Sequence, residues 1–314
     1  MKMEWRGVIP ALTTAFKEDL SVDSEFIRSH GRWLIDNGCS GIVALGSLGE
    51  AATLMESEKA EVLRACVEAA GARAPVVAGI SALSTREAVS LVRIAEGTGC
   101  SGLMVLPPYV YLGDWRETKA HVTAILRATN LSCMLYNNPI AYKVDFVVEQ
   151  VKELAGENRN LHAIKESSTD VRRVTALRAV LGDRLQVLVG VDDAIVESAG
   201  VGAAGWIAGL VNAFPKESVE LFELARSGRT QEALELYRWF LPLLRMDTVP
   251  KFVQLIKLVQ QETGTGTARV RPPRLELIGR ELEEARGVIS QALSSRPEGV
   301  RSTAFGARTP AAAM

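Results

Sequence analysis

Eight short apolar runs, rich in β-branched residues and separated by segments of helical pattern, recur along this 314-residue chain. Runs of this length and composition predict β-strands. They are Gly7–Leu12, Gly41–Leu45, Pro75–Gly79, Gly102–Leu106, Cys133–Tyr136, Leu161–Lys165, Gln186–Gly190 and Gly205–Ala208. Spacings of roughly 20 to 35 residues suit one strand and one helix per unit. The series predicts an α/β fold, a (β/α)8 TIM barrel. A doubly wound sheet is the alternative, but no Gly-x-Gly-x-x-Gly follows the first run.

The segments between the runs carry signals for helix starts at Asp23-Ser24, Thr53-x-x-Glu56 and Ser84-x-x-Glu87. More helical pattern follows the eighth run than a barrel needs to close. It occupies Pro215–Arg226, Gln231–Leu243, Pro250–Gln261 and about Leu275–Leu293. We therefore predict a barrel over residues 1–227, a small helical C-terminal extension over 228–295 and a flexible tail over 296–314.

Composition excludes several classes of function. The chain is 47% hydrophobic, and its 36 basic and 37 acidic residues give a net charge of −1 without long runs of one sign. This balance argues against nucleic acid and anionic membranes as partners. The first residues hold no apolar signal core, and no stretch approaches membrane-spanning length. The four cysteines form no Cys-x-x-Cys pair. We expect them to be reduced and mostly buried in a cytoplasmic protein.

Lys165 is the most informative single residue, because it ends the apolar run Leu161–Lys165 and is followed by Glu166-Ser167-Ser168. A lysine aimed into an apolar pocket is desolvated, which lowers its pKa toward that of a usable nucleophilic amine. The alternative is a strand-end lysine whose amine reaches solvent. Alternation along the strand places Lys165 and His162 on opposite faces. If Lys165 points inward, His162 faces the helices.

Active sites of barrels of this kind lie at the C-terminal ends of the strands, and two more candidate motifs fall there. Gly46-Ser47-Leu48-Gly49-Glu50 follows the second strand, and Tyr136-Asn137-Asn138-Pro139 ends the fifth. The first is a tight turn or a set of backbone N–H groups that bind a carboxylate. Tyr136 is a core aromatic or a phenol that transfers protons. With Lys165 these groups suit Schiff-base chemistry on a 2-oxo acid or a cyclic imine.

These motifs, together with Gly190-Val191-Asp192-Asp193, make the chain resemble the dihydrodipicolinate synthase/N-acetylneuraminate lyase family over about residues 5 to 290. The resemblance implies a barrel with a helical appendage, assembled as a homotetramer or homodimer. It implies Lys165 as the Schiff-base lysine and Tyr136 as proton donor or acceptor. The implied substrate-binding residues are Ser47, Leu48, the backbone of Ile207, Gly190 and Asn138.

Three departures from the synthase bear on the substrate. The arginine that grips a second carboxylate in the synthase is replaced here by Ala141, and the tyrosine that reaches a neighbouring subunit is replaced by Val110. Leu48 stands where the synthase has the second of two threonines. The chain is similar instead to the 1-pyrroline-4-hydroxy-2-carboxylate deaminases of bacterial hydroxyproline breakdown. This similarity is carried by the runs Gly46–Glu50, Tyr136–Lys143 and Gly209–Pro215.

The resulting expectation is a Schiff-base deaminase that converts 1-pyrroline-4-hydroxy-2-carboxylate to 2-oxoglutarate semialdehyde and ammonia. It needs no cofactor and no metal, and its partner is a small molecule with a carboxylate. The alternatives are a 2-keto-3-deoxy-sugar-acid aldolase or dehydratase, or a dihydrodipicolinate synthase-like lyase of the same family. A metal-dependent aldolase is disfavoured because only three histidines occur. A catalytically idle barrel that binds a ligand is the alternative from another class.

Overall fold

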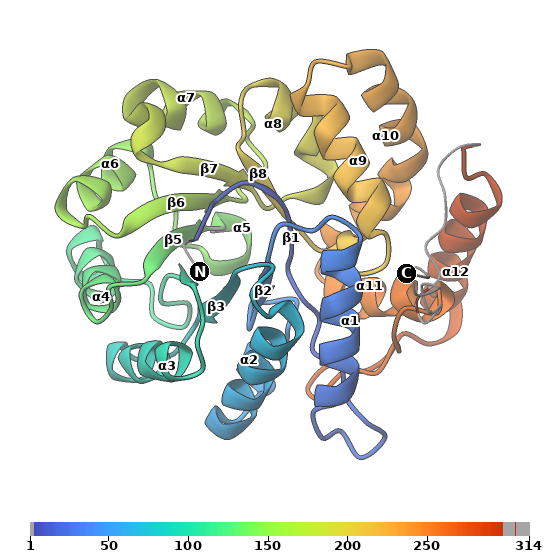
Figure 1. Ribbon diagram of the computed structural model, residues 1–314, viewed down its shortest axis with the longest axis horizontal. Coiled ribbons are helices and arrows are strands. Elements are labelled where there is room, and N and C mark those ends of the chain that lie inside the picture. The colour runs from blue at the N-terminus through green and yellow to red at the C-terminus, as the bar shows by residue number, and fades with distance from the viewer. Residues whose placement is uncertain (1–2, 298–304, 306–314) are drawn as a thin grey trace, which may run out of the picture.

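The computed structural model of the chain describes residues 3–297 and Phe305. Eight parallel strands form a nearly closed barrel with helices between successive strands, so the predicted (β/α)8 TIM barrel is confirmed. Figure 1 shows the strands at the centre, the helices around them and the C-terminal helices on one side. The order in the sheet is β1-β8-β7-β6-β5-β4-β3-β2. A parallel bridge between Ala11 and Val43 links β1 to β2.

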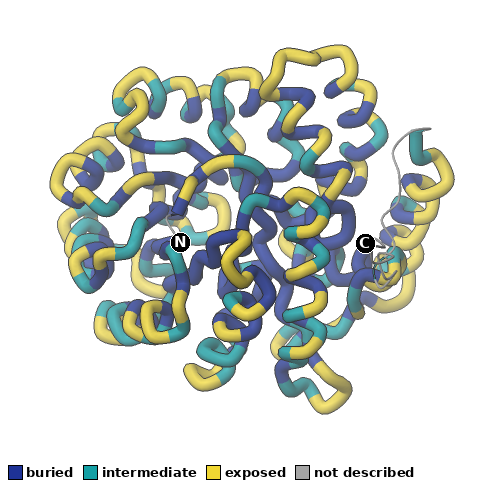
Figure 2. Tube along the Cα trace, viewed as in Figure 1, coloured by how far each residue is buried: buried dark blue, intermediate teal, exposed yellow. Residues whose placement is uncertain are grey.

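Each strand lies within about two residues of its predicted limits. The strands are β1 (Gly7–Pro10), β2 (Ile42–Ala44), β3 (Val76–Ile80), β4 (Gly102–Val105), β5 (Ser132–Asn137), β6 (Leu161–Glu166), β7 (Gln186–Val189) and β8 (Gly205–Ala208). Each of these segments forms a strand because it is a short, almost wholly buried apolar run that is covered on both faces. Figure 2 shows this buried centre and the exposed outer surfaces of the helices.

The barrel helices alternate with the strands, and three more follow them. The longer helices are α1 (Ser24–Asp36), α2 (Glu56–Ala70), α3 (Thr85–Gly97), α4 (Trp115–Arg127), α6 (Val148–Glu157), α7 (Arg172–Leu181), α9 (Pro215–Arg226), α10 (Thr230–Leu244), α11 (Phe252–Glu262) and α12 (Gly279–Ser294). The short helices are α5 (Pro139–Tyr142) and α8 (Ile195–Gly200). The 3-10 turns are η1 (Ala51–Thr53), η2 (Gly182–Arg184), η3 (Asp192–Ala194), η4 (Leu210–Asn212) and η5 (Arg245–Asp247).

Two of the three predicted helix starts are correct. The side chains of Asp23 and Ser84 accept backbone N–H groups at the first turns of α1 and α3. The prediction at Thr53 is wrong, because Thr53 belongs to η1 and α2 begins at Glu56. The Glu58 side chain accepts the Met55 N–H there at 2.8 Å. The short 3-10 turn after β2 therefore delays the helix by two residues.

The C-terminal helices pack against the barrel and against one another. α10 contacts α8, α9 and α12, and α11 contacts η4 and α12. Most of the predicted tail, residues 296–314, lies outside the described residues. Arg296 at its start pairs with the buried Glu217, and the Phe305 ring packs edge-on against Trp33 with centroids 5.5 Å apart. The predicted domain limits stay predictions.

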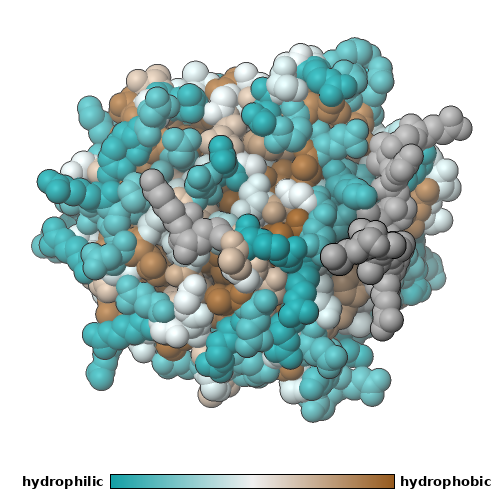
Figure 3. All heavy atoms as spheres, in the orientation of Figure 1, coloured by the Kyte–Doolittle hydropathy of each residue, from teal (hydrophilic) through white to brown (hydrophobic). Residues whose placement is uncertain are grey.

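The four cysteines are buried and free, as expected. The face of the molecule seen in Figure 3 is covered mostly by hydrophilic residues, with small hydrophobic areas between them. Within the described part of the chain, no helix is both long and apolar enough to cross a membrane.

Candidate active site at the strand ends

Lys165 and Tyr136 lie side by side at the C-terminal ends of β6 and β5. They are register partners in the parallel pairing of these strands, so their side chains leave the sheet on the same face. The Lys165 Nζ atom lies 4.3 Å from the centroid of the Tyr136 ring. Both residues are buried, with 6% of Lys165 and 5% of Tyr136 exposed. His162 is exposed, on the opposite face of β6, and contacts Ser132 Oγ through its Nδ1 at 2.7 Å.

Burial sets the electrostatics of the amine. It lowers the pKa of Lys165 from 10.5 to about 8, while the negative charges of Asp247 and Asp192 act in the opposite direction. An amine with such a pKa is partly unprotonated near neutral pH. Lys165 is therefore a buried, desolvated amine and not a strand-end lysine in solvent.

The Tyr136 hydroxyl is held by Asn138. The Asn138 Nδ2 atom donates to it at 3.0 Å, and the Oδ1 atom of the same amide accepts the Ala141 N–H at 3.0 Å. The second bond caps α5, so one side chain fixes both the phenol and the helix that follows β5. Burial raises the pKa of Tyr136, and the bond from Asn138 partly offsets this effect. Tyr136 is accordingly a protonated phenol near neutral pH.

The turn after β2 brings Ser47 to the same place. The Ser47 hydroxyl hydrogen-bonds the hydroxyl of Tyr142, whose ring lies edge-on to Tyr136 with centroids 5.7 Å apart. Leu48 is buried, so its side chain belongs to the core and only its backbone can serve a substrate. Glu50 closes the turn with a left-handed φ of 54°. Tyr142 was not predicted as a site residue, although it lies three residues after Pro139 of the tyrosine motif.

The Glu50 side chain anchors this turn to the C-terminal extension. Its Oε1 atom lies 2.5 Å from Lys257 Nζ on α11, and its Oε2 accepts the Arg271 N–H at 3.0 Å. Both members of the ion pair are buried, with side-chain exposures of 0% and 2%. Burial lowers the pKa of Lys257 to about 8. The extension therefore holds the turn that carries Ser47.

Gly190 provides the space that the lysine side chain occupies. A Cβ atom built on Gly190 would lie 2.2 Å from Lys165 Cε and 2.1 Å from Ser167 Oγ. Any other residue would displace the lysine. Ile207 is fully buried on β8, and its neighbour Trp206 points to the other face.

Two carboxyl groups complete the strand ends, and neither was predicted as a site residue. Asp192 stands in the motif after β7, but nothing in the sequence assigned it a role. Burial raises its pKa to about 6. Asp247 belongs to η5, about 80 residues beyond Lys165. It follows a helical pattern that indicates only packing, so no sequence signal could have identified it.

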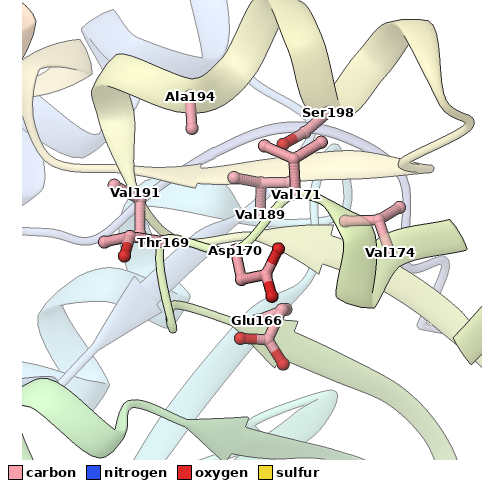
Figure 4. A pocket seen from close by; sticks show the side chains of 9 residues that line it. All are labelled: Glu166, Thr169, Asp170, Val171, Val174, Val189, Val191, Ala194 and Ser198. Carbon is pink, nitrogen blue, oxygen red and sulfur yellow. The ribbon is translucent and has the colours of Figure 1, made fainter. Parts of the chain in front are cut away.

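A small cavity lies behind the site, on the helix side of β6 and β7. Figure 4 shows Glu166, Val189 and Val191 around it, with Val174 of α7 and Ser198 of α8. Glu166 follows Lys165 and so points away from the barrel interior. The volume of about 10 Å³ suits a single water molecule. This cavity is not the substrate site.

The residues that depart from the synthase pattern lie at the rim. Ala141 is in the short helix α5, and Val110 is exposed in the loop after β4. Tyr109, just before it, lies against Tyr142 with ring centroids 6.1 Å apart. Among residues 3–297 and Phe305, no three His, Cys, Asp or Glu side chains are grouped to hold a metal ion.

A (β/α)8 barrel with a buried amine and a phenol at its strand ends is the general class that the fold and the site define. Comparison with known proteins identifies the family within that class. The Dihydrodipicolinate synthetase family matches residues 4–292. The chain therefore belongs to the dihydrodipicolinate synthetase family, and it is an enzyme of the lyase type.

Individual relatives agree with this assignment. The 4-hydroxy-tetrahydrodipicolinate synthase of Chelativorans sp. (strain BNC1) is 35% identical over 239 residues, which are 76% of this chain and 82% of that protein. The structure of the same enzyme from Methylacidiphilum fumariolicum SolV has a TM-score of 0.88 at 29% identity, covering 93% of this chain and 97% of that one. YagE of E. coli K12, described in complex with pyruvate, has a TM-score of 0.86 at 26% identity, covering 92% and 99%.

These relatives bear on the predicted subgroup. They carry the name of the synthase or of its family, so the comparisons support the family and not the deaminase subgroup. The predicted alternative, a lyase of the synthase type, agrees better with them.

Proposed function

We propose that this protein is a Schiff-base-forming lyase that acts on a small 2-oxo acid, with Lys165 as its nucleophile. The observation that carries the proposal is the buried amine of Lys165, whose pKa is about 8, lying 4.3 Å from the ring of Tyr136. The unprotonated amine adds to the C2 carbonyl, and the carbonyl oxygen leaves as water. The resulting iminium withdraws electrons and labilises bonds one and two atoms away.

The neighbouring residues have matching roles in this proposal. Tyr136 gives a proton to the departing oxygen and takes one from C3. Asn138 positions the phenol, because both ends of its amide are engaged. Ser47 and the backbone of Leu48 bind the substrate carboxylate. Gly190 leaves room for the lysine, and the Ile207 backbone forms the far wall.

The choice of substrate within the family depends on two kinds of observation. The names of the relatives favour 4-hydroxy-tetrahydrodipicolinate synthesis, and the pyruvate in the YagE complex supports a 2-oxo acid. Ala141 favours a second candidate, the deamination of 1-pyrroline-4-hydroxy-2-carboxylate, because a substrate with one carboxylate needs no arginine at that position. A 2-keto-3-deoxy-sugar acid satisfies the same condition.

The first test is trapping of the iminium. Purified protein is incubated with pyruvate and borohydride, and the modified peptide is identified by mass spectrometry. We expect the adduct on Lys165 in the wild type and none in Lys165→Ala. Lys143→Ala is the matched control, because Lys143 is close in the fold but donates to the carbonyl of Ile140 at the surface. An unmodified Lys165 refutes the proposal.

Three activity assays then separate the substrates. They measure 4-hydroxy-tetrahydrodipicolinate formation, ammonia release from the pyrroline, and pyruvate release from 2-keto-3-deoxy-sugar acids.

A cytoplasmic location and a homotetrameric or homodimeric assembly remain part of the proposal. One solved relative, with a TM-score of 0.85, is described as a monomeric dihydrodipicolinate synthase variant. Analytical ultracentrifugation of this protein would therefore measure whether it is a tetramer, a dimer or a monomer.

A further inference from the structure

The carboxyl groups of Asp192 and Asp247 both contact Gly209, the residue that directly follows β8. The Gly209 N–H donates to Asp192 Oδ2 at 3.1 Å. On the other side, a Cβ atom built on Gly209 would lie only 2.2 Å from Asp247 Oδ1, so the Asp247 carboxyl rests against the Gly209 Cα. Asp192 comes from the end of β7 and Asp247 from η5 of the C-terminal extension. The two are therefore close neighbours at the mouth of the barrel.

The surroundings of the two carboxyl groups differ. Asp192 accepts hydrogen bonds from Trp206 Nε1 at 3.0 Å and from the Leu210 N–H at 2.9 Å, besides that of Gly209. Such donors favour the ionised form. The Asp247 Oδ1 atom is buried and has no hydrogen-bond partner. Asp192 is buried and Asp247 is half-buried. Since two adjacent carboxyl groups do not readily ionise together and the donors all serve Asp192, we assign the proton to Asp247.

The charges around Asp247 support this distribution. Burial and the negative charges of Asp192 and Asp193 raise the pKa of Asp247 well above its usual range, and the Lys165 ammonium acts against them. Asp193 is itself 3.7 Å from Arg245 at the surface. In its ionised form Asp247 would raise the pKa of Tyr136 as well as that of Lys165, so the carboxyl group interacts with both groups of the proposed chemistry.

We propose that Asp247 is an acid catalyst that protonates a hydroxyl leaving group on C4 of a substrate bound to Lys165. The unpartnered Oδ1 atom of Asp247 lies against Gly209, directly after β8, at the end of the barrel where β6 presents Lys165 and β5 presents Tyr136. A substrate that extends beyond C3 from Lys165 would bring its C4 hydroxyl toward this end of the barrel. This inference rests on the proposed Schiff base and narrows the substrates to 4-hydroxy-2-oxo acids and their cyclic imines.

The step balances as an elimination of water. Tyr136 is left as a phenolate when it protonates the group lost from C2, which is the carbonyl oxygen of an oxo acid or the ring nitrogen of a cyclic imine. The phenolate takes the C3 proton, and the C–H electron pair forms the enamine. The enamine then re-forms the iminium and makes a C3–C4 double bond. The C4–O bond breaks, and the departing oxygen takes the Asp247 proton and leaves as water. Asp247 remains as a carboxylate that regains its proton from solvent. No oxidant, metal or further reactant is required.

The test uses the full-length protein, the variant Asp247→Asn and two probes. The probes are 2-oxo-4-hydroxypentanoate and its 4-fluoro analogue, and the readout is the absorbance of the conjugated 2-oxo-3-pentenoate. General acid catalysis is worth about 10²- to 10⁴-fold, so we expect kcat with the hydroxy probe to fall by that factor. Fluoride leaves without a proton, because HF is a far stronger acid than water. The fluoro probe should therefore react within about tenfold of the wild-type rate.

Two controls separate the proposals. Asp193→Asn removes a nearby negative charge without touching the buried oxygen, and it should retain wild-type elimination. Borohydride trapping of pyruvate in Asp247→Asn should stay within about twofold of wild type, since only the later step uses this acid. Equal loss with both probes would show a merely structural role and overturn the inference. So would unchanged elimination in Asp247→Asn, or a wild type that traps pyruvate but eliminates nothing from the hydroxy probe. Failure of wild-type trapping would instead refute the Schiff-base proposal itself.

Discussion

Gly190→Ala is the most direct perturbation of the proposed nucleophile, because it changes no polar group. The added Cβ would lie 2.2 Å from Lys165 Cε and 2.9 Å from Lys165 Cγ. Carbon atoms in good contact are about 3.5 Å apart or more, so the lysine stem must shift by about 1.3 Å. The methyl group would also lie 2.1 Å from Ser167 Oγ, so it cannot avoid the lysine by moving toward Ser167.

A misplacement of about 1 Å at a reacting group costs about 100-fold in rate. We therefore expect pyruvate trapping by borohydride to slow about 100-fold in Gly190→Ala. Overpacking of a buried site also lowers the free energy of unfolding by about 1–3 kcal/mol, which urea denaturation would measure. The fold should survive that loss. A slower reaction in a folded protein would then report the position of the lysine.

The matched control is Gly156→Ala, in the exposed part of α6. A Cβ atom there would meet nothing within 4 Å, and the helix should gain about 0.5–1 kcal/mol. Trapping should remain at the wild-type rate. If Gly190→Ala is folded and forms the iminium as fast as wild type, Lys165 does not react from the position described, and the reasoning fails.

Three further predictions concern the pH profile, the turn after β2 and the extension. The rate of iminium formation with pyruvate should rise with pH through a midpoint near 8, because only the unprotonated Lys165 amine reacts; a stopped-flow profile would measure it. Tyr142→Phe removes the hydroxyl bonded to Ser47, and a hydrogen bond worth about 1 kcal/mol predicts a KM for the 2-oxo acid raised about fivefold. Lys257→Met leaves the Glu50 carboxylate buried without its cation, which should lower the free energy of unfolding in urea by about 3–5 kcal/mol.

Each of these has a control. A pH profile with its midpoint near 10.5 would contradict the desolvated amine. Tyr111→Phe should leave KM unchanged, because that hydroxyl bonds Glu117 in the exposed loop. Lys251→Met breaks the exposed pair with Glu281 and should cost less than about 1 kcal/mol. Equal effects of Lys251→Met and Lys257→Met would show that burial of the pair does not matter.

The strands were predictable because each is a short apolar run, and burial on both faces leaves such runs little choice of conformation. Lys165 stood out for the same reason, as an amine that ends an apolar strand. The start of α2 was missed at Thr53 because residues 51–53 continue the preceding turn as η1. A capping pattern predicts a helix start only where the backbone is free to begin a helix. Here η1 occupies residues 51–53, so α2 begins at Glu56.

Asp247 was beyond prediction for a different reason. Sequence periodicity describes the face that a helix buries, whereas η5 lies between two such helices and carries no period of its own. Its carboxyl approaches Gly209 only because α10 and α11 both pack against the barrel. Asp192 could have been proposed as a site residue from the sequence, since its motif follows the end of a predicted strand. Its three donors, however, come from Trp206 of β8 and from Gly209 and Leu210, which directly follow that strand.

The extension is thus part of the site in two separate ways. Lys257 holds the turn that presents Ser47, and Asp247 lies against Gly209 directly after β8. A barrel cut after residue 227 would lose the partner of a fully buried carboxylate and the acid proposed for the leaving group. The barrel and its helices consequently form one catalytic unit, and a truncation that preserved activity would contradict both assignments at once.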